Sequence, residues 1–270
     1  MAKRSKRIGI FDSGLGGLHV LRHVARALPR YEYVYLADTA RAPYGHRSQK
    51  TIYTYTKQAV NFLFKKNCGI VIIACNTASS KALRMIQDKY GARKKVLGVL
   101  IPAAEEAVRK TKNKKIGIIA TQATVTSKKF VREIAKLDPA LHVYQQACPL
   151  LVPLVEAGSE NSREMRAALK KYLRPLLQKK IDTLILGCTH YGILEKQIRA
   201  IAGPNIAIVS ESRVVPKKLK EYLKRHREIE RALKKGTGVY FYSTDGSDTF
   251  TRLGSKLYGK KITVEKAVLL

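Results

Sequence analysis

The sequence contains no tryptophan, three methionines and only four cysteines among its 270 residues. The cysteines, at positions 68, 75, 148 and 188, are too few for a disulfide framework and lack the Cys-x-x-Cys spacing of a zinc site. Apolar runs reach about six residues, far short of the ~20 that a membrane helix needs. The basic segment 1–7 leads into an apolar stretch that Asp12 interrupts, which argues against a secretory signal. These absences favour a cytoplasmic protein with reduced thiols and no membrane partner.

Acidic side chains are also scarce, because 20 Asp and Glu stand against 52 Lys and Arg, and the formal net charge is +32. A charge of this size makes nucleic acids and other polyanions the first partners to consider. However, the densest basic segment, residues 213–235, has ten Lys and Arg against three Glu and contributes only +7. Zinc-finger, RNA-recognition and KH signatures are absent from the sequence. The distribution therefore favours solvated helix faces over a dedicated nucleic-acid site.

A long apolar run, Gly-Ile-Val-Ile-Ile-Ala at residues 69–74, predicts a strand buried on both faces of a parallel sheet. It ends at Cys75, and a helical pattern follows over 79–86. Ligands of open α/β sheets bind at the carboxyl ends of strands, beside helix N-termini. Since a helix end supplies N–H groups and partial positive charge, we expect the pKa of this thiol to be lowered.

The same arrangement recurs at residues 182–191, where a short apolar strand ends at Cys188. The strand pattern that starts at Ile8 begins 67 residues before Cys75, and a similar one that starts at Ile116 begins 72 residues before Cys188. The chain therefore looks like one α/β unit used twice. Chance repetition of a common strand pattern is the alternative.

The predicted fold class is α/β, with two similar doubly wound, mostly parallel-sheet domains related by a pseudo-two-fold and an active site in the cleft between them. The first domain is predicted to comprise residues 1–99 plus 213–270, with the C-terminal segment packing back, and the second residues 100–212. Late strands are expected at 239–242 and 262–264, and a basic helix from Pro216. Asn161 and Glu164 resemble a capping box for the helix before the second cysteine.

A glycine-rich turn follows the first strand at residues 14–17. It has neither the Gly-x-Gly-x-x-Gly spacing of a dinucleotide site nor the Gly-Lys-Ser/Thr of a phosphate-binding loop. The turn would instead direct the carboxylate of Asp12 and the hydroxyl of Ser13 at a small ligand. Alternatively, Asp12 merely caps the following helix.

Two thiols at strand ends suit few chemistries. A disulfide does not fit a reducing compartment, and a metal site of two cysteines plus His190 lacks a fourth ligand. A cysteine hydrolase needs one thiol and an oriented base. Stereoinversion at carbon uses both, because one thiolate removes a proton from one face and the other thiol returns a proton to the opposite face. Cys68 and Cys148 are expected to be small buried hydrophobes.

Six ordered motifs resemble the glutamate branch of the aspartate/glutamate racemase family: Asp-Ser-Gly-Leu-Gly-Gly at 12–17, Ala-Asp-x-x-Arg-x-Pro-Tyr-Gly at 37–45, Cys-Asn-Thr-Ala at 75–78, Thr-x-x-Thr at 121–124, Pro-Leu-x-x-Pro-Leu-x-Glu at 149–156 and Gly-Cys-Thr-His-Tyr at 187–191. The resemblance extends from about residue 8 to 244. Two segments depart from the family pattern: Gly192-Ile193 replaces Pro-Leu, and 210–213 replaces an Asp-Ser-Ala-like segment.

The resemblance implies a cofactor-independent, metal-free racemase that interconverts L- and D-glutamate and supplies D-glutamate for peptidoglycan. Cys75 and Cys188 would be the two bases, with Asp12 assisting the first and His190 with Glu156 assisting the second. The α-carboxylate and ammonium would be held by Asn76, Thr77, Thr121, Thr124 and Thr189. The side-chain carboxylate would be framed by Ser13, Pro43, Tyr44 and Gly45.

Other hypotheses stay open. A racemase of the same family could act on another acidic amino acid such as aspartate. The charge of +32 instead suggests a nucleic-acid- or topoisomerase-binding role, although the same positive potential would also steer an anionic substrate toward the site. Glutamate and a second copy of the chain in a homodimer are the other predicted partners.

Overall fold

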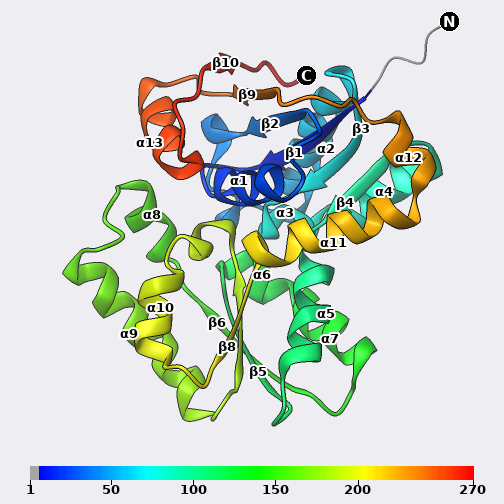
Figure 1. Cartoon of the computed structure of the whole chain (residues 1–270). Coiled ribbons are helices and arrows are strands. Elements are labelled where there is room, and N and C mark those ends of the chain that lie inside the picture. The colour runs from blue at the N-terminus through cyan, green and yellow to red at the C-terminus, as the bar shows by residue number, and fades with distance from the viewer. Residues whose placement is uncertain (1–5) are drawn as a thin grey trace, which may run out of the picture.

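The computed structural model describes residues 6–270, so most of the basic segment at 1–7 lies outside the described residues. The chain forms two sheets, one above the other in Figure 1. Strand order is β10-β9-β2-β1-β3-β4 in the first sheet and β6-β5-β7-β8 in the second. Every pairing between these strands is parallel. The order β2-β1-β3-β4 therefore recurs as β6-β5-β7-β8, which confirms the predicted pair of similar parallel α/β units.

The strands lie close to the predicted apolar runs. Those of the first sheet are β1 (Arg7–Asp12), β2 (Tyr33–Ala37), β3 (Cys68–Ile73), β4 (Lys95–Gly98), β9 (Val239–Ser243) and β10 (Val264–Lys266). Those of the second are β5 (Lys115–Ala120), β6 (His142–Ala147), β7 (Thr183–Gly187) and β8 (Ala207–Ser210). β9 pairs with β2, so the end of the chain returns to the first sheet.

Helices cover both faces of each sheet. The α-helices of the first half of the chain are α1 (Gly17–Ala27), α2 (Gln49–Lys65), α3 (Asn76–Lys81), α4 (Leu83–Tyr90) and α5 (Leu100–Lys110). Those that follow are α6 (Gln122–Ser127), α7 (Lys129–Leu137), α8 (Leu151–Glu156), α9 (Arg163–Gln178), α10 (Glu195–Ala202), α11 (Glu211–Arg225), α12 (Arg227–Ala232) and α13 (Asp248–Tyr258). Short 3₁₀ turns are η1 (Thr39–Arg41), η2 (Tyr44–His46), η3 (Gly91–Arg93) and η4 (Thr189–Gly192). No helix of the described chain combines the length and apolar character needed to cross a membrane.

The unbroken apolar strands are buried because each sheet has a hydrophobic core on both faces. In β1, Ile8 and Ile10 face the core beneath α1 and α11, whereas Phe11 belongs to the core on the α2 side. The second sheet is enclosed by α5 and α7 on one face and by α9 and α10 on the other. Figure 1 shows α11, in gold, at the junction of the two sheets.

Three local predictions need correction. The cap of α9 is Ser162, whose hydroxyl accepts the N–H of Met165 at 3.1 Å, and not Asn161, because Ser162 has the extended backbone of an N-cap. The basic helix α11 begins at Glu211, and Pro216 lies inside it. β10 begins at Val264, since Ile262 is buried in the core instead of joining the ladder.

Candidate active site

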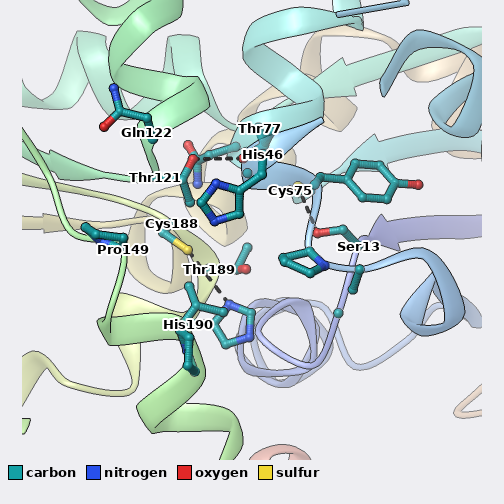
Figure 2. Close-up of a pocket in the computed structure, with 18 of the residues that line it drawn as sticks. Ser13, His46, Cys75, Thr77, Thr121, Gln122, Pro149, Cys188, Thr189 and His190 are labelled. Atoms are coloured by element: carbon teal, nitrogen blue, oxygen red, sulfur yellow. Dashed lines mark hydrogen bonds between the residues drawn. The ribbon is translucent and has the colours of Figure 1, made fainter. Parts of the chain in front are cut away.

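A cavity of about 220 Å³ lies at the carboxyl ends of β1, β3, β5 and β7, between the two sheets. Figure 2 shows side chains of both halves surrounding it. Of the fourteen predicted site residues, all except Asp12 and Thr124 line the cavity: Ser13, Pro43, Tyr44, Gly45, Cys75, Asn76, Thr77, Thr121, Glu156, Cys188, Thr189 and His190. The structure thus brings together residues from six separate motifs.

Cys75 forms the first side of the site. It is the N-cap of α3, and its sulfur accepts the backbone N–H of Ala78 at 3.5 Å. The hydroxyl of Ser13, from the end of β1, lies 3.2 Å from the same sulfur. Cys75 is only 5% exposed, so these two groups supply the hydrogen bonding that water would otherwise supply.

Cys188 forms the second side and has different neighbours. It follows β7, and its sulfur lies 3.8 Å from Nδ1 of His190. Nε2 of His190 lies 2.9 Å from Oε1 of Glu156, which comes from the end of α8. The imidazole therefore bridges a thiol and a carboxylate, an arrangement that orients the ring and lets it exchange a proton with the sulfur.

Asp12 lies behind the cavity wall, fully buried. Its carboxylate accepts the N–H groups of Gly14 and Gly17, both at 3.1 Å, and the hydroxyl of Thr189 at 3.4 Å. Burial raises its pKa to about 6, although His190 and the two N–H donors act in the opposite direction. Asp12 accepts an N–H at the start of α1, as the capping alternative predicts, and it also contacts the turn after Cys188; its carboxylate lies behind the cavity wall and does not line the cavity.

The glycine-rich turn is explained by a close approach between the two halves. A Cβ on Gly16 would lie 2.4 Å from the Thr189 hydroxyl and 2.7 Å from the His190 backbone nitrogen. A Cβ on Gly17 would lie 2.4 Å from that of Asp12. These glycines let α1 begin directly against the η4 turn. The close approach of this turn explains the glycines without a bound phosphate.

Hydroxyl groups also connect the two α/β units across the cavity, at a place different from the glycine-rich turn. The Thr77 and Thr121 hydroxyls lie 3.0 Å apart, although the residues begin different helices, α3 and α6 (Figure 2). The Thr121 hydroxyl donates to that of Thr124 at 3.1 Å. Thr124 itself is fully buried and reaches the cavity only through Thr121.

The loop 42–46 lines the cavity, but the phenol of Tyr44 is already engaged. Its hydroxyl donates to the buried carboxylate of Asp38, which also accepts Nε–H of Arg41 at 2.8 Å and the hydroxyl of Thr244 at 3.0 Å. Asp38 therefore holds the loop in place, and Tyr44 contributes to the shape of the wall while its hydroxyl serves this anchor.

Burial controls the protonation of both thiols. It raises the pKa of Cys75 to about 12, and the charge of Asp12 adds to the rise, whereas Ser13 and the N–H of Ala78 lower it. Burial also raises the pKa of Cys188 well above its ordinary value, and the backbone N–H of His190 offsets only part of this rise. The expected lowering of the thiol pKa is therefore wrong, because removal of water destabilises a thiolate more than one N–H at a helix end stabilises it.

Sequence reasoning missed several lining residues: Gly14, Ala42, His46, Gln122, Cys148, Pro149, Val152 and Pro153. Most of them lie inside or next to one of the six motifs, so their place beside a motif indicates that they line the site. Cys148 is buried as predicted, and it also forms part of the cavity wall. Its backbone carbonyl accepts the hydroxyl of Tyr191 at 3.0 Å, which ties this wall to the turn after Cys188.

Comparisons with known proteins agree with this geometry. The family model described as Asp/Glu/Hydantoin racemase matches residues 8–211. The chain is 42% identical over 258 residues to glutamate racemase 2 of Caldanaerobacter subterraneus subsp. tengcongensis, with 96% of this chain and 95% of that protein covered.

Two solved structures have the same architecture over nearly the whole chain. The crystal structure of glutamate racemase isoform RacE1 from Bacillus anthracis matches with a TM-score of 0.91 and 33% identity, covering 98% of each chain. The crystal structure of glutamate racemase from Francisella tularensis subsp. tularensis SCHU S4, in complex with D-glutamate, gives a TM-score of 0.89 and 30% identity, again covering 98% of each chain. The sequence profile, the full-length similarity and the shared architecture together lead to one conclusion: this chain belongs to the Asp/Glu/hydantoin racemase family.

Proposed function

We propose that this protein is a glutamate racemase that interconverts L- and D-glutamate with two cysteine bases and supplies D-glutamate for peptidoglycan. The observation that supports it best is the placement of Cys75 and Cys188 at the ends of two equivalent strands, β3 and β7, beside one small cavity. The full-length similarity to glutamate racemases identifies the amino acid.

In the proposed reaction, one cysteine acts as a thiolate and removes the α-proton, which breaks the Cα–H bond and forms an S–H bond. The opposite cysteine, as a thiol, donates its proton to the other face of the same carbon and becomes the thiolate. Cys75 and Cys188 exchange these tasks when the other enantiomer is the substrate. The enzyme ends with the two protonation states reversed, and proton exchange through Asp12 or His190 restores them.

Substrate binding supplies what the free site lacks for thiolate formation. The ammonium group of glutamate brings a positive charge into a buried site, and a nearby opposite charge lowers the pKa of a thiol. Asn76, Thr77, Thr121, Thr124 and Thr189 are proposed to bind or support the α-carboxylate and ammonium. Donors that hold the α-carboxylate also stabilise the negative charge that develops at Cα.

The other carboxylate of glutamate is proposed to lie toward the loop at 42–46, framed by Ser13, Pro43, Tyr44 and Gly45. Because the Tyr44 hydroxyl is committed to Asp38, backbone groups of this loop and the Ser13 hydroxyl are the proposed donors. The full-length similarity to glutamate racemases supports glutamate over the shorter aspartate as the substrate.

The proposal is tested by circular dichroism of L- or D-glutamate incubated with the protein and no added cofactor. We expect both enantiomers to reach the racemic mixture, and Cys75→Ala and Cys188→Ala each to abolish turnover. Cys68→Ala is the matched control, since Cys68 lies in the core of the first sheet. Native turnover by either site variant would refute the two-base assignment, and faster turnover of aspartate would move the substrate assignment to the alternative.

We also propose a domain division, a cellular location, an oligomeric state and a role for the net charge. We infer two domains, residues 1–99 plus 213–270 and residues 100–212, a cytoplasmic location and a homodimer. The charge of +32 is proposed to steer anionic substrate toward the site. A nucleic-acid role predicts retention on DNA at low salt that falls steeply as salt rises. Light scattering tests the homodimer, and a DNA column run at low and high salt tests retention on nucleic acid.

A further inference from the structure

Glu211 is a buried acid that the two-thiol mechanism does not use. It follows β8, begins α11 and is only 3% exposed. Neither of its carboxyl oxygens has a hydrogen-bond partner among the described residues, and no described Lys, Arg or His forms an ion pair with it. An ionised carboxylate in such a place is costly, so burial raises the pKa of the Glu211 carboxyl well above its ordinary value.

Asn76 is the complementary group on the other side of the junction. It directly follows Cys75, is 2% exposed and lines the cavity. Both polar atoms of its amide are likewise without a partner among the described residues. Its side chain faces Glu211 closely enough to lower the pKa of that carboxyl, and the two side chains stop short of hydrogen-bond geometry.

The two unpartnered oxygens of Glu211 and the two unpartnered amide atoms of Asn76 can satisfy one another. A neutral carboxyl group has one O–H donor and one carbonyl acceptor, and a primary amide offers the same pair of functions. Together they can form two parallel hydrogen bonds. A carboxylate could accept the amide N–H but would leave the Oδ1 atom of Asn76 opposite a second negatively charged oxygen.

We propose that Glu211 is a positioning residue which acts as a neutral acid, donating to Oδ1 of Asn76 and accepting from Nδ2. This pairing fixes the amide so that its second N–H is available to the substrate. It also keeps negative charge away from Cys188, whose thiol an ionised Glu211 would make harder to deprotonate. The inference deepens the proposed racemase function and rests on it for the substrate.

Kinetics of three variants test the proposal. Glu211→Gln retains one donor and one acceptor, so we expect kcat and KM within about twofold of the wild type. Glu211→Leu leaves the Asn76 amide unpaired, and we expect KM for both enantiomers to rise at least about tenfold. Glu221→Gln, on the exposed part of the same helix, is the control. Wild-type kinetics in Glu211→Leu, or an equal defect in the glutamine and leucine variants, would overturn the proposal.

Coupling to Asn76 separates positioning from a general loss of structure. If Glu211 acts through the amide, Glu211→Leu should add no further defect to Asn76→Ala. A double variant whose fold-loss in activity equals the product of the two single losses would contradict this coupling.

A further measurement does not depend on racemisation. The infrared carbonyl band of a protonated carboxyl should be present in the wild type at neutral pH and absent from Glu211→Gln. Absence of the band from the wild type would overturn the inference even if the enzyme is active. Conversely, a wild type that shows the band but does not racemise glutamate would refute the proposed function alone.

Discussion

The two sides of the candidate site share a backbone plan and differ in their proton chemistry. Cys75 and Cys188 both follow the third strand of a repeated strand order. On the first side, the sulfur has a serine hydroxyl beside it and a buried aspartate behind it. On the second, it has an imidazole backed by a glutamate. The repeated unit therefore supplies two equivalent thiol positions, and unrelated segments place different polar groups beside each sulfur.

The largest expected effect tests whether both thiols are needed. Replacing either cysteine with serine leaves a hydroxyl that is a far weaker base than a thiolate, so we expect kcat to fall by about 10³-fold or more in each variant. Racemisation rates by circular dichroism measure this. A much smaller loss for one of the two variants would show that only the other cysteine is required for turnover.

The next effect sharpens the difference between the two sides. His190→Asn removes the imidazole that lies 3.8 Å from the Cys188 sulfur, and if this ring serves Cys188 as proposed, kcat should fall by about 10²-fold. Because L- and D-glutamate are equally stable, kcat/KM must remain equal in the two directions. The primary isotope effect with α-deuterated substrate should nevertheless rise for the enantiomer whose proton Cys188 removes. Equal isotope effects for both enantiomers would mean that His190 does not serve Cys188 selectively.

Asp12 provides a pH-dependent effect on stability. Its pKa is about 6 in the folded protein and about 3.9 in an unfolded chain, so between these values the unfolded state loses the proton that the folded state keeps. Folding stability should therefore fall by about 2–3 kcal/mol as pH rises from about 4 to 6.

The control for this prediction is Asp12→Asn, which cannot titrate and should lack this part of the pH dependence. Urea unfolding at several pH values provides the measurement. An identical pH dependence in the variant and the wild type would show that Asp12 does not hold its proton in the folded state.

The smallest effects concern the contact between the glycine-rich turn and the turn after Cys188. A methyl group on Gly16 would meet the His190 backbone, so Gly16→Ala should cost about 1–3 kcal/mol and displace His190. Gly192→Ala should cost less, because its added Cβ would lie no closer than 3.1 Å to any neighbour, whereas that of Gly16 would lie 2.4 Å from the Thr189 hydroxyl. Thermal unfolding of both variants gives the order, and a larger loss in Gly192→Ala would contradict it.

Much of this molecule followed from its sequence. Unbroken apolar runs identified the parallel strands, because a strand buried on both faces has no polar alternation. The cysteines could be placed at strand ends, since the apolar run stops there. The prediction of Asn161 as the cap of α9 is wrong, because Asn161 and Ser162 are both good capping residues and only the path of the chain shows that Ser162 takes this position.

Local patterns and motifs therefore predicted which residues form the site, whereas the tertiary structure sets their pKa values. The sequence by itself determined two α/β units, two thiols at equivalent positions and most of the side chains around them. Only the tertiary structure decided that Asp12 lies behind the cavity wall, that burial raises the pKa of both thiols and that Glu211 faces Asn76. The reason is that a pKa depends on the water excluded and the charges gathered by segments far apart in the chain, as where Asp12 meets Thr189, and no local pattern records that exclusion.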